Sequence, residues 1–213
     1  MRKRNFQNNL NCSFYICRKH SKFMTCIVGL IHKGEVHLAG DSAGVAGLSI
    51  SIRADKKVFV NKKFVMGFTS SFRMGQLLQY SFKPPVHKKG VPDMEYMVTS
   101  FVTAIRKCFK DHGFGHMTEG RDNSGGTFLV GYNGRLYRIE SDFQVGETFV
   151  PYEAVGCGSD IALGALFALS GVIMEPEDRL QLALEAASKF SAGVEAPYNF
   201  VKLPKPNGRR SNS

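Results

Sequence analysis

The chain has 213 residues and a mass of 23.6 kDa, which suits one domain of ordinary size. It carries 28 Lys and Arg against 18 Asp and Glu, but ten of the basic residues lie in residues 1–24 and 202–213, which contain no acid. Residues 25–201 are therefore neutral, which argues against nucleic acid as a partner. No apolar run reaches the roughly 18 residues of a membrane helix, so we expect no membrane partner and a soluble protein.

The cysteines and the two ends of the chain suggest where the protein is located and how it is organised. Five scattered cysteines, an odd number, do not predict a disulfide framework, so we expect a reducing, cytoplasmic compartment. The basic N-terminus lacks the apolar stretch of a secretory signal. We expect a basic extension or propeptide in residues 1–24, one domain in residues 25–201 and a disordered basic tail in residues 202–213.

The predicted elements alternate in groups rather than one by one. Residues 25–32 and 35–39 predict a hairpin around the turn pair Lys33-Gly34. The remaining elements, in chain order, are strands at 57–60 and 64–69, helices at 71–82 and 93–110, strands at 127–131, 135–140 and 149–156 with an Asn133-Gly134 turn, and helices at 160–169, capped by Ser159, and 176–190. This order predicts an α+β fold, a four-layer αββα sandwich with two sheets between helix pairs.

The first predicted hairpin brings two reactive groups together. Its arms are nearly equal in length, so antiparallel pairing returns Asp41 to the neighbourhood of Thr25. Thr25 follows Met24, so it becomes a chain terminus if a propeptide is cut there, or if translation starts at Met24 and the Met is removed. A terminal Thr supplies a hydroxyl nucleophile and an α-amine base with a pKa of about 7.7–8.0. Such a pair needs a nearby cation with a carboxylate partner, for which Lys56 or Lys57 and Asp41 are candidates.

Several segments together resemble the proteasome β-type threonine peptidases, particularly the bacterial ATP-dependent protease subunit HslV. They are TCIVGLIHKGEVHLAGD, ADKKV, FVMGFTSS, FLVGYNGRLYRIE and AVGCGSDIALGAL. The similarity covers roughly residues 25–195. With Thr25 as the first residue of the domain, Asp41 and Lys57 stand in the register at which that family keeps its catalytic Asp and Lys.

The resemblance implies a role for each of these residues. Thr25 would be the N-terminal nucleophile, Lys57 the cation that tunes it, and Asp41 the carboxylate that orients Lys57. Backbone N–H groups within residues 67–71 would hold the oxyanion, with Gly67 and Ser70 as candidates.

Two segments depart from the family pattern. Cys157 stands where the family has the Ser of a Gly-Ser-Gly segment, and because a thiol is the weaker hydrogen-bond donor, Ser159 is a second candidate for supporting the Thr25 amine. The family's later Asp-x-x-Ser-Gly segment is altered here to residues 188–193 (SKFSAG), with Lys189 near the expected Asp.

The resemblance also implies an activity and its partners. We expect a threonine endopeptidase of the N-terminal nucleophile hydrolase class, matured by processing and acting on unfolded protein or peptides. The active sites would face the chamber of a homo-oligomeric ring supplied by an ATP-dependent unfoldase, and no cofactor or metal is implied. Two alternatives remain open: a non-catalytic scaffold or assembly protein on the same fold, and a small-molecule amidohydrolase of the same class.

Other motifs predict chemistry less well. Residues 40–44 (GDSAG) match the Gly-x-Ser-x-Gly elbow of serine hydrolases, but the residues after them do not predict the required helix. Processing one residue later would make Cys26 terminal, and CIVGL faintly resembles class II glutamine amidotransferases. Two further pairs are poor metal ligands, because glycines interrupt the first and the second lacks a matching pair: His112 with His116, and Cys12 with Cys17.

Overall fold

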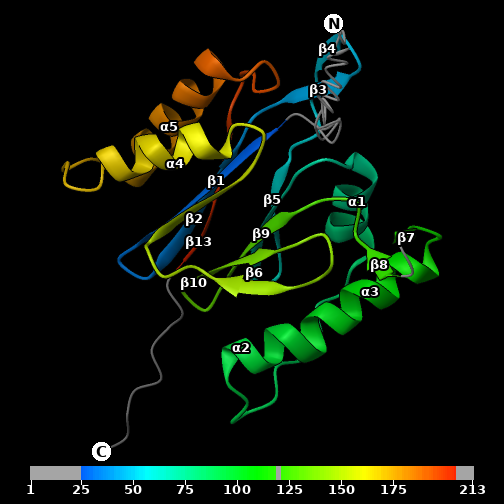
Figure 1. Cartoon of the computed structure of the whole chain (residues 1–213). Coiled ribbons are helices and arrows are strands. Elements are labelled where there is room, and N and C mark those ends of the chain that lie inside the picture. Colours follow the sequence, from blue (N-terminus) through cyan, green and yellow to red (C-terminus); the bar gives the residue numbers. More distant parts are fainter. Residues whose placement is uncertain (1–24, 119–120, 205–213) are drawn as a thin grey trace, which may run out of the picture.

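The computed structural model describes residues 25–118 and 121–204, and two antiparallel sheets form its centre (Figure 1). The first sheet has the strand order β12-β1-β2-β13, with β1 (Cys26–His32), β2 (Glu35–Gly40), β12 (Tyr152–Gly156) and β13 (Asn199–Leu203). The predicted hairpin of β1 and β2 is confirmed, with Ile27 opposite Gly40 and His32 opposite Glu35. Lys33 and Gly34 have positive φ angles of 51° and 82°, as a two-residue hairpin turn requires.

The second sheet has the order β11-β10-β9-β6-β5 and lies against the first. Its strands are β5 (Val58–Asn61), β6 (Phe64–Phe68), β9 (Phe128–Tyr132), β10 (Arg135–Ile139) and β11 (Val145–Glu147). The predicted turn at Asn133-Gly134 is confirmed, because both residues have positive φ. Two small hairpins complete the strands: β3 (Ala43–Ala46) with β4 (Ser49–Ile52), and β7 (His116–Thr118) with β8 (Arg121–Asn123).

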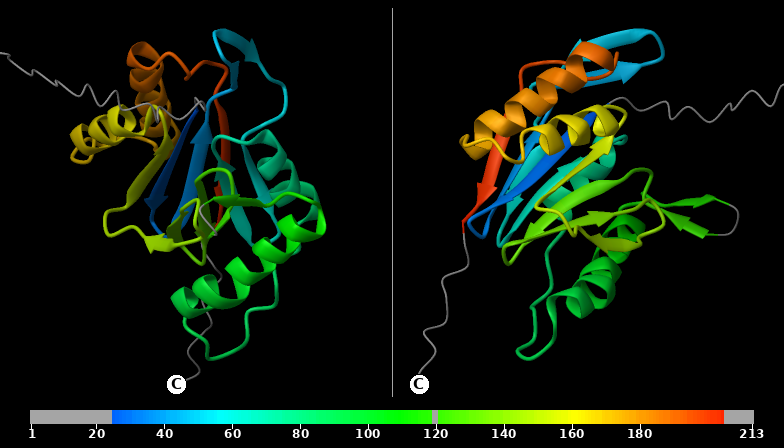
Figure 2. Two further views of the ribbon diagram at one scale, coloured as in Figure 1. Left: turned by 45° about the vertical axis from the view of Figure 1, so that its right-hand side comes forward. Right: turned by 60° about the vertical axis from the view of Figure 1, so that its left-hand side comes forward.

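Helices cover the outer faces of both sheets, which confirms the four-layer αββα arrangement (Figure 2). Helices α4 (Ser159–Ala168) and α5 (Pro176–Phe190) pack on the first sheet. A longer helical layer packs on the second sheet: α1 (Phe72–Gln76), the π-helical turn η1 (Leu77–Ser81), α2 (Asp93–Tyr96), the π-helical turn η2 (Met97–Phe101) and α3 (Val102–Asp111). None of the helices within the described residues is long and apolar enough to cross a membrane.

Three apolar clusters hold these layers together, and the alternation of side chains along the strands separates them. On β1, Val28 and Leu30 face α4 and α5, whereas Ile27 faces the second sheet. On β6, Phe64 and Met66 contact the α1–α3 layer, whereas Val65 points between the sheets. Both faces of each sheet are therefore buried, which explains the continuous apolar runs of the central strands.

The structure corrects two local expectations. Ser159 does not cap α4: Gly158 is the N-cap, and no side chain makes the capping hydrogen bond. Lys202 and Leu203, expected to belong to a disordered tail, pair with β2 in strand β13. The expected extension (residues 1–24) and the remainder of the expected tail (residues 205–213) lie outside the described residues.

Candidate active site

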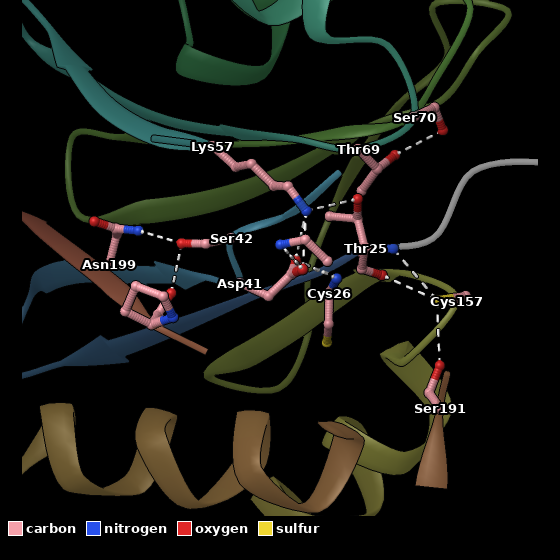
Figure 3. Close-up of polar contacts among 12 residues, drawn as sticks. Thr25, Cys26, Asp41, Ser42, Lys57, Thr69, Ser70, Cys157, Ser191 and Asn199 are labelled. Carbon is pink, nitrogen blue, oxygen red and sulfur yellow. Dashed lines mark hydrogen bonds and ion pairs between the residues drawn. The ribbon is translucent and has the colours of Figure 1, made fainter. Parts of the chain in front are cut away.

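Thr25, Asp41 and Lys57 meet where three strand ends come together (Figure 3). Thr25 directly precedes β1, and Asp41 directly follows β2, so the first hairpin brings them side by side, as its equal arms predicted. Lys57 directly precedes β5 in the other sheet, and its carbonyl oxygen accepts a hydrogen bond from the Phe68 amide. The three residues are thus held by paired strands rather than by a mobile loop.

The Lys57 ammonium lies between the carboxylate and the hydroxyl. Its Nζ is 2.9 Å from both Oδ1 and Oδ2 of Asp41 and 3.1 Å from Oγ1 of Thr25. The Asp41 carboxylate also accepts hydrogen bonds from the Cys26 amide at Oδ1 and the Ala43 amide at Oδ2, each 2.9 Å long. With both oxygens held in this way, the carboxylate fixes Lys57 in position to donate to the Thr25 hydroxyl.

This polar group is almost completely removed from solvent. Asp41 is 0% exposed, Lys57 1% and Thr25 4%. Burial lowers the pKa of Lys57 from its usual value, and the neighbouring Asp41 carboxylate opposes that shift. Burial raises the pKa of Asp41, opposed by the Lys57 charge and by the amides of Cys26 and Ala43. In such surroundings a fixed ammonium stabilises a developing alkoxide far more than it would in water.

The backbone nitrogen of Thr25 faces Cys157, at the loop between β12 and α4. It donates to Cys157 Sγ over 3.3 Å, and Cys157 Sγ lies 3.2 Å from Ser191 Oγ (Figure 3). Gly156 has φ of +106°, and a Cβ there would overlap the carbonyl oxygen of Thr25, so only glycine lets this loop approach the threonine. Cys157 therefore contacts the nitrogen that would be the α-amine of a chain beginning at Thr25.

The two oxyanion candidates differ in their backbone surroundings. Gly67 lies inside β6, opposite Val58 and Leu129, and a Cβ there would lie 2.6 Å from Ile27 Cγ2, so this glycine allows the sheets to pack closely. Ser70 follows the strand with a positive φ of 70°. Among the described residues, its amide has no acceptor, whereas the Thr69 and Ser71 amides donate to carbonyl oxygens.

Two serines near the loop of Cys157 remain: Ser159, which was a predicted candidate, and Ser191, which was not. Ser159 Oγ lies 3.5 Å from Asp160 Oδ1, at the start of α4. Ser191 contacts Cys157 instead. Ser191 lies in the altered segment of residues 188–193. The Ser of the family's Asp-x-x-Ser-Gly segment was the sequence signal that could have identified it.

The competing nucleophiles are both buried in structural roles. Cys26 is 0% exposed, packs against the core beneath α4 and α5, and has its thiol pKa raised by burial. Ser42 is 1% exposed, and its hydroxyl donates to the Pro197 carbonyl and accepts from Asn199 Nδ2. A strand, β3, follows Ser42, which confirms the prediction that no elbow helix begins there.

Metal coordination has little support in the described part of the chain. No three His, Cys, Asp or Glu side chains within it are grouped so that they could hold a metal ion. His112 donates from Nδ1 to the Cys108 carbonyl at the end of α3, over 2.8 Å.

Comparison with known proteins identifies the fold. No protein-family model matches the chain, and no curated protein matches its sequence. Several solved structures are similar to the chain. BPH of Thiobacillus denitrificans superimposes with a TM-score of 0.72 at 18% identity, and the match covers 86% of this chain and 100% of that one. A complex of BPH with epoxomicin gives a TM-score of 0.71. HslV of Trypanosoma brucei gives 0.60 at 18% identity (84% and 99% covered), and Anbu, an ancestral β-subunit of Yersinia bercovieri, gives 0.59 at 16% (84% and 82%).

Proposed function

Because the chain has the proteasome β-type fold of N-terminal nucleophile hydrolases, we propose that it is a threonine endopeptidase with Thr25 as its nucleophile. One observation supports this most strongly: Lys57 Nζ lies 3.1 Å from Thr25 Oγ1 and is held by the buried Asp41 carboxylate. This is the arrangement needed to stabilise an alkoxide at a threonine hydroxyl.

The proposed reaction begins once cleavage before Thr25 has freed its α-amine. The amine, beside Cys157, takes the proton from Oγ1 as that oxygen attacks the substrate carbonyl carbon, and Lys57 stabilises the developing charge on Oγ1. The carbonyl oxygen becomes an oxyanion that accepts a hydrogen bond from the Ser70 amide, whose position meets this need better than that of Gly67.

The second half of the proposed reaction releases the products. The scissile C–N bond breaks, the α-ammonium of Thr25 returns its proton to the leaving amine, and an ester on Oγ1 remains. The α-amine then takes a proton from the water that attacks the ester carbonyl carbon. The ester C–Oγ1 bond breaks, the acid product leaves, and the α-ammonium returns the proton to Oγ1, which restores the threonine hydroxyl. No step in this sequence requires a cofactor.

Assembly and substrate delivery belong to the proposal as well. We expect a homo-oligomeric ring that hydrolyses unfolded protein within its chamber, supplied by an ATP-dependent unfoldase in the cytoplasm. Exposed aliphatic side chains on the β3–β4 hairpin support an assembled state, since such groups commonly mark interfaces: Leu48, Ile50 and Ile52. This hairpin projects beyond the two main sheets (Figures 1 and 2).

A non-catalytic scaffold is the second candidate, and the altered residues around the amine favour it. Cys157 offers a thiol where the resembling family has a hydroxyl, and the segment of residues 188–193 lacks the expected Asp. A scaffold would not need a free α-amine on Thr25. A small-molecule amidohydrolase would need that amine but would not hydrolyse unfolded protein.

The decisive experiment combines intact mass and N-terminal sequencing of the purified protein with an assay on unfolded casein. We expect a chain that begins Thr-Cys-Ile-Val, degrades casein, and binds epoxomicin, as the Thiobacillus protein does. Thr25→Ala should remove hydrolysis while circular dichroism stays unchanged. A chain that keeps Met24 and shows no hydrolysis would favour the scaffold, and turnover of small amides without casein would favour the amidohydrolase.

A further inference from the structure

The pairing of β6 with β9 ends in an irregular pair of residues. The last regular pair is Phe68 with Phe128, so Thr69 stands opposite Thr127 one position further on. At a hydrogen-bonded position of an antiparallel ladder, two opposite residues exchange both backbone hydrogen bonds. Between Thr69 and Thr127 only one is present, from the Thr69 amide to the Thr127 carbonyl oxygen over 3.0 Å. The Thr127 amide donates instead to the Thr69 hydroxyl, with N 3.3 Å from Oγ1. The side chain of Thr69 therefore replaces its own carbonyl group as the acceptor.

The Thr69 carbonyl oxygen is thereby available for a different bond. It accepts a hydrogen bond from the Ser71 amide over 2.8 Å. A bond between the carbonyl of one residue and the amide two positions later closes a γ-turn, and the φ of +70° at Ser70, the central residue, is that of the rare and strained form. The turn uses the carbonyl before Ser70 and the amide after it. The Ser70 amide, which is the proposed oxyanion donor, therefore takes no part in the turn.

The Thr69 hydroxyl uses its full hydrogen-bonding capacity in this arrangement. A hydroxyl has one donor and two acceptor positions. Oγ1 donates to the Thr127 carbonyl oxygen over 2.7 Å, accepts from the Thr127 amide, and lies 3.2 Å from Ser70 Oγ (Figure 3). Because the Thr69 proton is directed to the Thr127 carbonyl, the Ser70 hydroxyl is the donor in the third contact. Thr69 is only 4% exposed, so water has little access to replace these bonds.

The residues on either side keep the turn in place. Ser71 is the N-cap of α1, and its Oγ accepts from the Met74 amide over 3.2 Å. Gly126, just before β9, passes so close that a Cβ there would lie 2.7 Å from the Thr69 carbonyl oxygen and 2.9 Å from Ser70 Cβ. A strained conformation persists only where the surrounding structure fixes it. Here α1 fixes one side of the turn and the start of β9 fixes the other.

We propose that Thr69 is a positioning residue for the oxyanion of the proposed peptidase reaction, on which this inference rests. Its hydroxyl replaces its carbonyl group in the ladder, and the released carbonyl closes the turn that presents the Ser70 amide. Without the hydroxyl, the Thr127 amide would pair with the carbonyl of residue 69, and the regular ladder would extend by one pair of residues. The γ-turn would then open, and the Ser70 amide would leave the position at which it meets the oxyanion.

The kinetic test compares Thr69→Ala and Thr69→Ser with the parent in the hydrolysis of fluorescein-labelled casein. Because the Ser70 amide acts in the transition state, Thr69→Ala should lower kcat by about tenfold to a hundredfold and leave KM within about threefold. Thr69→Ser keeps the hydroxyl, so its kcat should stay within about threefold of the parent value. Thr148→Ala is the matched control and should behave as the parent does. It removes a hydroxyl that likewise donates to backbone carbonyls, those of Val150 and Tyr152, in the loop before β12.

A crystal structure of Thr69→Ala tests the inference without relying on activity. It should show the Thr127 amide bonded to the carbonyl of residue 69, and a negative φ at Ser70. A Ser70 φ that stays near +70° would overturn the inference. Thr69→Val, which also lacks the hydroxyl, provides the same test if Thr69→Ala does not fold.

The kinetic results can overturn the inference independently. A kcat for Thr69→Ala equal to that of the parent would do so, as would a loss in Thr69→Ser or Thr148→Ala as large as the loss in Thr69→Ala. A parent protein that begins at Thr25 and hydrolyses nothing would refute the proposed function instead. In that case the crystal structure would still decide whether Thr69 holds the turn.

Discussion

Lys57 and Asp41 come from facing sheets, and the ammonium of one lies 2.9 Å from both carboxylate oxygens of the other. The contact joins the end of β2 to the start of β5 in a region without solvent. It therefore stabilises the packing of the two sheets and positions a cation at Thr25 at the same time. The stability of the fold should depend on keeping the two charges paired, whereas activity should need both residues.

Removing one member of this pair should destabilise the protein strongly. Lys57→Met leaves a buried carboxylate without its cation, which typically costs about 3–5 kcal/mol, and it should also abolish peptide hydrolysis. Lys57→Met/Asp41→Leu should recover much of the stability but none of the activity. Urea unfolding measures the first effect, with Lys63→Met on the exposed β5–β6 turn as control. A fully active Lys57→Met would exclude Lys57 from the mechanism.

Ser70→Gly tests whether the backbone amide is the group that matters at this position. Because φ is +70°, glycine should relieve strain and stabilise the fold by about 1 kcal/mol. The amide remains, so kcat/KM should stay within about threefold of the parent value. A loss of about a hundredfold would show instead that the Ser70 hydroxyl is needed.

Cys157→Ser should preserve or raise activity, because a hydroxyl is the stronger hydrogen-bond partner for the Thr25 amine. Cys157→Ala removes the partner and should lower kcat by about three- to tenfold, the value of one hydrogen bond. Cys108→Ser, on α3, is the control for removal of a thiol. Equal rates for the Ser, Ala and parent proteins would mean that position 157 does not support the amine.

His37 should make the protein less stable in mild acid. This residue is 5% exposed, and burial lowers its pKa from the ordinary value of 6.5, with Glu35, 3.6 Å away, opposing the shift. Between the lowered pKa and 6.5 the unfolded chain binds more protons than the folded one, so the free energy of unfolding falls as pH drops below 6.5.

The measurement is urea unfolding at about pH 7.5 and about pH 5.5. His37→Gln should reduce the loss of stability between the two pH values, whereas His32→Gln, which leaves the buried ring in place, should not. An unchanged pH dependence in His37→Gln would refute the assignment.

Local sequence patterns predicted well those helices and strands whose signals lie within one short stretch of the chain. The hairpin of β1 and β2 follows from two apolar runs of matched length around Lys33-Gly34, and α5 begins at Pro176 as predicted. The β3–β4 hairpin was missed, because each strand has only four residues: β3 consists mostly of small residues, and the Ser-Ile alternation of β4 is brief. Strand β13 was missed for a different reason: its pairing with β2 joins residues about 160 positions apart.

The sequence by itself determined that Asp41 returns to Thr25, because strand length and turn position are local properties. It also placed Lys57 and Cys157 as candidates, through a resemblance in register rather than through any visible contact. Only the tertiary structure decided that Lys57 reaches across from the second sheet, that Ser191 rather than Ser159 contacts Cys157, and that Ser70 has an amide without an acceptor among the described residues. These three findings depend on how the two sheets and the loops at their ends pack, and packing brings together residues that are far apart in the sequence.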